Sequence, residues 1–412
     1  MTPAMRTPEI ADRMHEIDWI RALAVFILIC IHAGSVFDPY PPFGAKGPPT
    51  KYIMVGVSFF HQWRLVLLFL ISGAATFKAL ANQPPLTYLR KRLVRLLIPL
   101  IVGTCLIVPI DLYIVFGPRP VSVHSFLDFD TALWGRTFHH RTDPGLGLGL
   151  GHLWFLGYLI LYSIVSMPLF LWLRSPSGRT LLARLVRLTT RGGRILLWAL
   201  PLMLIAVTLR ARWPIETRKF FDDWDAVARY CCAYVIGYVI VAAPDFLERV
   251  RRSAGTALAI GVATSVVVVT AQCWGLGPAP GESAAWLIYA AIMGLNQWVW
   301  AVGILGLAGR HLRFANGLSL YLRDAVYPIF VLHLPVLSLL SCSVVAWPIP
   351  AICQFTAIVC GTLSISLALY EYGVKRHRVG RFLFGLRPLK SKPSHTSTVL
   401  SPHAVQVPNE AQ

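Results

Sequence analysis

The sequence predicts an all-α integral membrane protein: a polytopic bundle of about ten transmembrane helices with both termini in the cytoplasm. Hydrophobic residues make up 56% of the 412 residues and charged residues only 14%, a composition that excludes an ordinary soluble domain. The apolar runs are long and continuous, whereas a transmembrane β-barrel would show short segments of alternating polarity. These runs predict spans at 17–37, 52–77, 96–116, 152–173, 195–209, 226–243, 254–274, 284–308, 323–342 and 350–373.

The loops between these spans predict the topology. Lys and Arg are frequent in every second loop, as in 78–95 and 174–194, and sparse in the others. The positive-inside rule assigns the basic loops to the cytoplasm, so the net charge of +19 reflects topology and contact with anionic lipid rather than nucleic-acid binding. The arginine spacing in 174–194 predicts a basic amphipathic helix on the membrane surface. The chain then divides into a cytoplasmic N-terminal segment (1–16), a membrane domain (17–385) and a disordered cytoplasmic tail (386–412).

The first span carries ionisable residues that a membrane helix normally avoids. Such residues are costly in lipid and indicate a functional site that faces the protein interior. Asp18 and Arg21 stand one turn apart and can pair, and His32 follows Arg21 eleven residues later. Eleven residues make about three turns and rise roughly 16 Å, so Arg21 and His32 share one face. The pattern puts a cation near the inner surface and a proton-transfer group about half-way into a hydrocarbon core ~30 Å thick.

Further polar residues lie in or beside five other spans. His61 and Arg64 begin the segment HQWRLVLLFLISG near the outer surface. Arg92 and Arg95 are one helical turn apart at the cytoplasmic start of the third span. The segment HLWFLG opens the fourth span, YPIFVLHLP lies in the ninth, and Tyr-Glu-Tyr ends the tenth. These last three segments supply His152, Trp154, His333 and Glu371.

Each of these residues also has a purely structural interpretation, and the residues alone leave both open. The charged ones could be anchors at the two membrane surfaces: Arg92, Arg95, His61 and Arg64. Trp63 and Trp154 are typical of the aromatic belt at the membrane–water interface. His333, close to Pro335, could pack between helices, and Glu371 could pair with a nearby cation.

Several other motifs predict no further chemistry. The eight cysteines form no CxxC pair, so neither a disulfide scaffold nor a zinc site is predicted. His139, His140 and Asp143 lack a further ligand, and no metal site is predicted there. The run PGLGLGLGH at 144–152, in the long external segment 117–151, follows no strand and is not a phosphate loop. The chain has no Gly-x-Ser-x-Gly and no His-Glu-x-x-His, so a serine hydrolase or a zinc peptidase lacks support.

Taken together, the polar segments resemble the acyltransferase type 3 family of polytopic membrane O-acyltransferases. The family's first-helix pattern, an Arg, ten residues and then a His, is matched by Arg21 and His32. Its Arg-x-x-Arg at the start of the third helix is matched by Arg92 and Arg95. HLWFLG and YPIFVLHLP are similar to its other recurrent segments, and HQWRLVLLFLISG and ALYEYGVKRHRVGRFLFG look closest to its glucan-modifying branch. The resemblance covers roughly residues 15–385.

The resemblance implies an enzyme of a bacterial inner membrane. It would move an acyl group from a cytoplasmic donor, which the resemblance implies is acyl-CoA, to a hydroxyl of an extracytoplasmic carbohydrate such as a periplasmic glucan or a surface glycan. The chemistry of the residues agrees, because histidine is the side chain whose pKa lies nearest the operating pH, and His32 is the natural general base or acyl relay. Arg21, Arg92 and Arg95 could hold the phosphates of the donor.

The remaining assignments complete the sequence-based hypothesis. Asp18 joins Arg21 and His32 as a catalytic residue, and no bound cofactor is expected beyond acyl-CoA as co-substrate. Supporting or acceptor-side roles fall to His61, Arg64, His152, Trp154, His333 and Glu371. The alternative is a secondary transporter or exporter of a polar solute that uses the first-span charges as a proton relay, although the chain lacks the pseudo-symmetric halves that transporters commonly show. The oligomeric state is not predicted.

Overall fold

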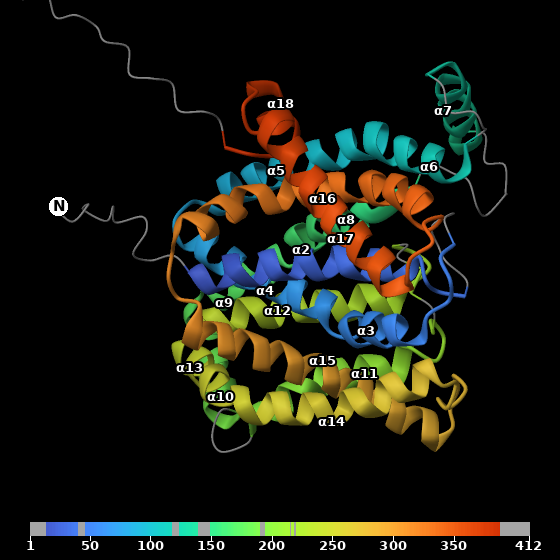
Figure 1. The fold of residues 1–412 in the computed structure, drawn as a ribbon. Helices are drawn as coiled ribbons and strands as arrows, with labels where there is room; N and C mark the ends of the chain where they lie inside the picture. The colour runs from blue at the N-terminus through green and yellow to red at the C-terminus, as the bar shows by residue number, and fades with distance from the viewer. Residues whose placement is uncertain are drawn as a thin grey trace, which may run out of the picture.

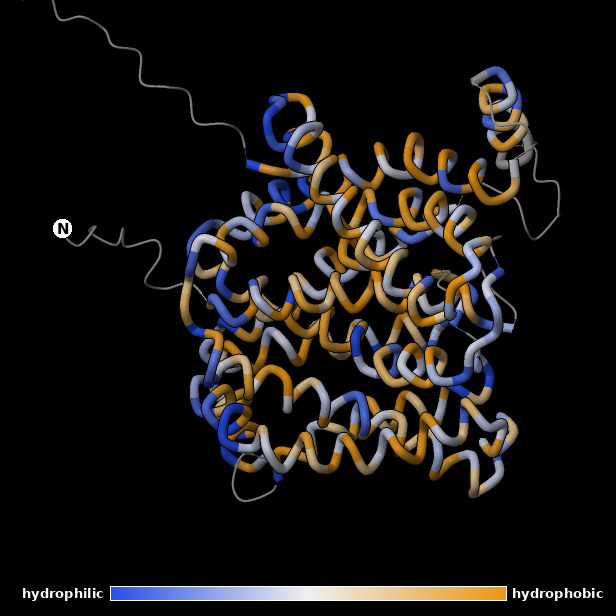
Figure 2. Tube along the Cα trace, viewed as in Figure 1, coloured by the Kyte–Doolittle hydropathy of each residue, from blue (hydrophilic) through white to orange (hydrophobic). Residues whose placement is uncertain are grey.

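The protein is a bundle of helices that run back and forth between two ends (Figure 1). The computed structural model describes residues 14–39, 46–117, 123–138, 149–189, 194–214, 216–217 and 220–387. Within these ranges every regular element is helical, as predicted. Hydrophilic residues collect toward the ends of the bundle, and hydrophobic residues fill the helices between them (Figure 2). The architecture is that of a polytopic helical membrane protein.

The described helices account for each of the ten predicted spans. Eight helical segments in this part of the chain are long and apolar enough to cross a membrane. They are α2 (His15–Ser35), α3–α4 (Lys51–His61, Arg64–Ala81), α5–η1–α6 (Pro85–Val102, Gly103–Ile107, Val108–Phe116), α12 (Trp224–Ala242), α14 (Ala254–Cys273), α15 (Ala284–His311), α16 (Gly317–Val344) and α17–η4 (Ala351–Ala368, Leu369–Val374). The fourth predicted span is broken into η2–α8 (Gly151–Leu153, Trp154–Val165) and α9 (Met167–Leu173), and the fifth is the shorter η3–α11 (Arg194–Ala199, Leu200–Leu209).

Four further helices lie outside these segments: α7 (Val123–Phe138), α10 (Pro176–Thr189), α13 (Pro244–Arg252) and α18 (Arg378–Leu383). Helix α10 is the predicted basic helix of the loop 174–194, whereas α7 falls in a segment for which the sequence predicted no helix. The boundaries also shift, because α2 begins at His15 and the third span begins at Pro85. The run PGLGLGLGH lies largely outside the described residues, as do His139, His140, Asp143 and the tail from 388 onward.

The loops define two ends of the bundle. The inner end, which carries the basic loops, comprises residues 82–84, 174–175, 243–253, 312–316 and 375–387. The outer end comprises residues 36–39, 46–50, 210–214, 220–223, 274–283 and 345–350. Helix α2 begins at the same end at which α18 lies (left in Figure 1), as ten crossings require.

Prolines account for breaks within the spans. Helices α8 and α9 meet at 48° around Ser166, two residues before Pro168. Proline lacks an N–H and its ring collides with the carbonyl one turn back, so a straight helix cannot continue through it. Likewise the π-helical turn η1 comes just before Pro109 and shifts the hydrogen-bond register there.

Helices α4 and α12 contact each other more extensively than any other pair of described helices, and two glycines allow their close approach. A Cβ atom on Gly73 would lie 1.8 Å from the carbonyl oxygen of Tyr234, and one on Gly237 would lie 1.8 Å from that of Leu70. Small residues are the usual means by which membrane helices bring their backbones together, since packing rather than water exclusion drives their association. The contact fixes the tyrosine-bearing face of α12 against the centre of the bundle.

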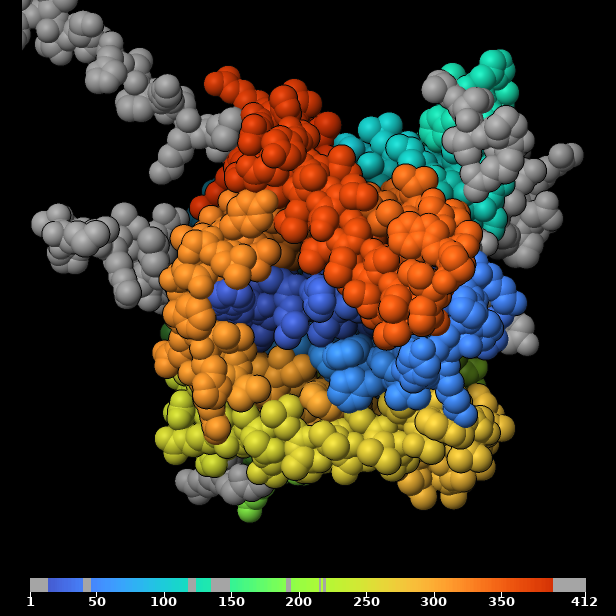
Figure 3. Space-filling view, viewed as in Figure 1, coloured from blue at the N-terminus to red at the C-terminus, as the bar shows by residue number. Residues whose placement is uncertain are grey.

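Helix α2 contacts α3, α15, α16 and α17, and on the face drawn in Figure 3 a strip of it is visible between α16, α17 and α3. Leu23, 49% exposed, lies on the exposed side of α2. His32 follows Leu23 after nine residues, which turns an α-helix through about half a revolution beyond two full turns. His32 therefore points to the opposite side, into the bundle.

Candidate active site

The centre of the candidate site is a pair of histidines from α2 and α16. His32 Nδ1 lies 3.0 Å from His333 Nε2, and the two ring planes differ by only 9°. The side chain of His333 is completely buried, at 0% exposure. Two imidazoles within hydrogen-bond distance inside a membrane bundle are costly to bury unless both are satisfied, so this pair is a candidate for function.

Pro335 explains how a third histidine joins the pair. Because proline has no N–H, the carbonyl of Val331, four residues earlier, loses its helical hydrogen bond. His152 Nε2 lies 2.9 Å from this carbonyl oxygen and donates the missing bond. The ring of His152 then stands perpendicular to that of His333, with 5.3 Å between the ring centroids. His152, the first residue of the HLWFLG segment, is thus held by the backbone carbonyl that Pro335 leaves unpaired in α16.

The hydrogen bonds of His333 assign the tautomers of the pair. His333 Nδ1 lies 2.8 Å from the carbonyl oxygen of Phe330, and a carbonyl can only accept. Nδ1 of a neutral His333 therefore carries the proton, and its Nε2 presents a lone pair. His32 Nδ1–H donates to that lone pair, which leaves the basic lone pair of a neutral His32 on Nε2. This is the arrangement that a general base requires.

Arg64, the first residue of α4, is buried and lies within electrostatic reach of His333. Its place in the second span agrees with the segment that the sequence singled out. His61, on the previous turn beyond the Gln62–Trp63 break, lies instead on the lining of a cavity at the outer end. His61 and Arg64, which the sequence analysis grouped together, therefore lie in different environments.

The inner end of α2 holds the other two predicted catalytic residues. Arg21 Nη1 donates to Asp18 Oδ1 at 3.4 Å, the pairing that their spacing predicted. Asp18 is buried, and its charge also acts on Arg323 of α16. Asp18 and Arg21 are thus bound to each other, at about 21 and 16 Å from His32 along the helix axis.

Arg92 reaches into the bundle rather than out to solvent. Its Nε donates to Ser163 Oγ of α8 at 2.7 Å, and its guanidinium lies over the rings of Tyr88 and Tyr234 at 5.8 and 6.0 Å. A chain of hydroxyls continues this network, because Tyr88 donates to Thr76, which also bonds Tyr234. Arg95 is exposed, and its carbonyl oxygen accepts a long hydrogen bond of 3.4 Å from Tyr327.

Three more residues received a structural interpretation from the sequence: Trp63, Trp154 and Glu371. The assignment of Trp63 and Trp154 to the aromatic belt is wrong, because both indoles are buried among aromatic rings inside the bundle. Glu371 has the ion pair that its structural interpretation required, with Lys375 at 2.8 Å, and it also accepts from Tyr321 at 3.2 Å.

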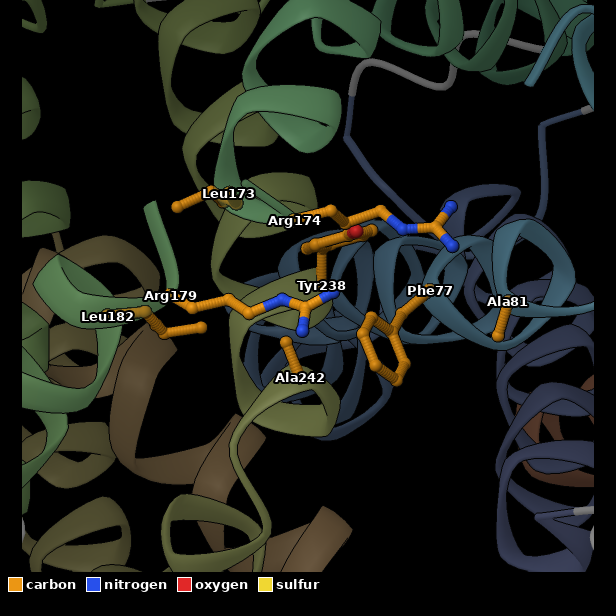
Figure 4. A pocket seen from close by; sticks show the side chains of 8 residues that line it. All are labelled: Phe77, Ala81, Leu173, Arg174, Arg179, Leu182, Tyr238 and Ala242. Atoms are coloured by element: carbon orange, nitrogen blue, oxygen red, sulfur yellow. The ribbon is translucent and has the colours of Figure 1, made fainter. Parts of the chain in front are cut away.

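Two cavities open near these residues. The larger, at the outer end, has a volume of about 690 Å³ and includes His61 and Asp38 in its lining. The smaller, of about 230 Å³, lies at the inner end between α4, α9, α10 and α12. Arg174 and Arg179 lie beside Tyr238 in its lining (Figure 4). Tyr238 is one turn of α12 away from Tyr234, which contacts Arg92.

Comparison with known proteins decides the kind of chemistry. A family model described as an acyltransferase domain, Acyl_transf_3, matches residues 14–371. The chain belongs to the acyltransferase 3 family. The protein is therefore a membrane acyltransferase, an enzyme, and the transporter alternative is set aside.

The chain is also similar to several curated proteins that share one name. The chain is 21% identical to proteins named glucans biosynthesis protein C from Salmonella paratyphi B, Salmonella dublin and Salmonella enteritidis. Each comparison covers 92% of this chain and 96% of the relative. No solved structure matches the chain.

Proposed function

We propose that this acyltransferase moves an acyl group from acyl-CoA in the cytoplasm to a hydroxyl of an extracytoplasmic carbohydrate, such as a periplasmic glucan, across a bacterial inner membrane. The observation that carries the proposal is the part-buried hydrogen bond of 3.0 Å between His32 and His333. Family membership supplies the reaction type, and the name of the relatives supports a glucan as the carbohydrate.

The reaction assigns a task to each histidine. As the acceptor hydroxyl attacks the thioester carbonyl, its proton passes to His32 Nε2, a C–O bond forms and the C–S bond breaks. His32 then returns the proton to the departing thiolate of coenzyme A, so that atoms and charge balance. His333 is a positioning residue, because its Nε2 holds His32 in the reactive tautomer. General-base catalysis of this kind contributes about 10²–10⁴-fold to a rate.

Cations at the inner end support the donor half of the proposal. Acyl-CoA carries several phosphates, which guanidinium groups bind through charge-assisted hydrogen bonds. Arg21 lies near the inner end of α2, and Arg92 and Arg95 lie in the first third of the span Pro85–Phe116. Their position suits a donor whose phosphates stay at the inner surface while its thioester, on the long pantetheine arm, extends toward His32.

The test is acyl transfer by the His32→Ala variant, reconstituted in proteoliposomes with acyl-CoA and glucan. We expect a fall of about 10²–10⁴-fold in kcat with little change in the KM for acyl-CoA. The matched control is His311→Ala, which removes an exposed histidine from the last turn of α15. Activity of His32→Ala equal to that of the control would overturn the assigned role, and mass spectrometry of the glucan identifies the group that is transferred.

A further inference from the structure

The cavity at the outer end is large enough for a ligand and reaches deep into the bundle. Its volume of about 690 Å³ lies within the range of about 300–1,000 Å³ typical of small-molecule sites. It begins at Pro49 and Thr50, in the segment before α3, and it extends to Gln297 on α15. Gln297 is thirteen residues, roughly 20 Å, beyond the outer start of α15 at Ala284, and Arg229 is five residues, roughly 8 Å, beyond the start of α12 at Trp224.

Two residues of the cavity lining each carry a buried side-chain atom without a hydrogen-bond partner among the residues that the structure describes. Gln297 and Arg229 are each only 4% exposed, and the atoms in question are Gln297 Oε1 and Arg229 Nε. The guanidinium of Arg229 is held in place by Asp225, at 2.7 Å from its Nη2. One unused atom is an acceptor and the other a donor. A hydroxyl group serves both, because it donates and accepts at once.

The charges around the cavity favour a neutral ligand. Its lining contains the cations Lys51, Arg210 and Arg229 and the carboxylates Asp38 and Glu216. Asp225, behind the lining, lies within 3.4 Å of Arg210 as well as contacting Arg229. The cationic and anionic side chains are therefore balanced, and an anion entering the cavity would meet carboxylates.

Uncharged hydrogen-bonding groups complete the wall. Gln272 Oε1 accepts from Ser58 Oγ at 2.7 Å and from Gln62 Nε2 at 2.6 Å. Amide and hydroxyl side chains in mixed donor and acceptor roles match the edge of a sugar ring, which presents the same groups.

We propose that this outer cavity is the acceptor site and that it takes a neutral, hydroxyl-rich sugar unit, with Gln297 and Arg229 as its deepest contacts. The assignment rests on the proposed function. The cavity is joined to the histidine pair by two elements: Asp38, in its lining, lies six residues after His32, and His61 lies three residues before Arg64. Helix α2 continues to Ser35, about 4.5 Å beyond His32 along its axis, and Asp38 lies in the turn that follows.

The first experiment measures binding without any acyl donor. Calorimetry with the full-length protein in lipid nanodiscs uses an uncharged β-linked glucose tetrasaccharide, compared with a glucuronic acid tetrasaccharide of equal length. We expect the neutral sugar to bind more tightly, and Gln297→Leu to weaken its binding about tenfold, the effect of losing one hydrogen bond. The matched control is Gln354→Leu, another buried glutamine, which lies at the outer start of α17 and away from the cavity.

Equal binding by the wild type and Gln297→Leu, no binding of the neutral sugar, or preference for the charged one would each overturn the proposal. Because no donor is present, the result does not depend on acyl transfer. Sugar binding without any transfer to glucan would contradict the proposed function and leave the carbohydrate site standing.

A cysteine in the cavity wall allows a second, independent experiment. Cys273 lines the cavity, with its Sγ 3.9 Å from the carbonyl oxygen of Met54. A membrane-impermeant maleimide added from the outer side should label Cys273, and the neutral tetrasaccharide should slow this labelling several-fold. The Cys273→Ser variant gives the labelling of all other cysteines, which is subtracted. A labelling rate at Cys273 that saturating sugar leaves unchanged would contradict the site.

Discussion

Replacing His333 with Phe removes the lone pair that holds His32 in one tautomer while keeping a flat ring in the site. His333 is fully buried, so no water takes over the bond of 3.0 Å to His32 Nδ1. An N–H left unsatisfied in a buried place costs about 1–3 kcal/mol. His32 can avoid this cost by rotating out of its reactive orientation. A preference of this size for the unreactive orientation lowers kcat by about 5- to 150-fold, at 1.36 kcal/mol for each factor of ten.

The assay follows acyl transfer to glucan at saturating acyl-CoA, with His333→Phe compared with His333→Gln. The glutamine variant keeps an acceptor oxygen on a side chain of similar reach, so we expect it to recover most of the lost rate. The KM for acyl-CoA should stay constant in both, because His333 lies six residues, about 9 Å along α16, beyond Tyr327, which contacts Arg95. Thermal unfolding of each variant separates lost folding from lost catalysis. Wild-type kcat in His333→Phe, or an equal loss in His333→Gln at unchanged stability, would refute the positioning role.

The structure makes three further predictions. Gly73→Ala should lower the free energy of unfolding by about 1–3 kcal/mol, because the new Cβ would meet the backbone of α12. The control Gly56→Ala, with open space around it, should stay within about 0.5 kcal/mol of wild type in thermal unfolding. Equal stabilities of the two variants would contradict the packing of α4 on α12. His152→Phe should destabilise the protein by about 1–3 kcal/mol, because it leaves the Val331 carbonyl unpaired. This loss of stability should be smaller in a Pro335→Ala background, in which a backbone N–H can bond the carbonyl. Additive effects in this double-mutant cycle would contradict the hydrogen bond from His152 to Val331. Arg92→Lys should raise the KM for acyl-CoA about tenfold, since an ammonium cannot reproduce the guanidinium fork. The control Arg90→Lys, on the exposed side of the same helix, should leave this KM unchanged. Equal KM values for the two variants would contradict binding of acyl-CoA by Arg92.

Hydrophobicity and spacing predicted the framework of the molecule well. Each of the ten apolar segments corresponds to a helical segment, because long apolar runs have few alternatives in a membrane. The pairing of Asp18 with Arg21 also followed from spacing alone, since residues three apart on a helix are neighbours. Helix α7 was missed because the Gly- and Pro-rich ends of the external segment obscured a helix between them.

Contacts between distant segments could not be predicted in this way. His32 and His333 are 301 residues apart in sequence, and the periodicity of each helix says nothing about which helix lies beside it. The position of Pro335 did signal an unpaired carbonyl at Val331, but not that His152 would satisfy it. The same limit explains the error at Trp63 and Trp154, because an aromatic residue in a membrane helix can face the lipid interface or the bundle core.

The outer cavity left a signal that sequence reasoning missed. Asn296 and Gln297 stand together in the middle of the 28-residue helix α15, where polar amides are costly. Asn296 is explained by its bonds to Ser265 and Thr264 of α14, at 2.9 and 2.8 Å. Gln297 has no such explanation within the described residues for its side-chain oxygen, and this contrast is what directs attention to the cavity.

The central claim is that an acyl group crosses the membrane plane through the histidine pair. Its most direct test uses sealed proteoliposomes of one orientation, with acyl-labelled acyl-CoA confined to the side of Arg92 and Arg95 and glucan to the opposite side. We expect labelled glucan on the far side with the wild type and at least a hundredfold less with His32→Ala. Transfer only when both substrates share one side, or equal labelling by His32→Ala, would contradict it.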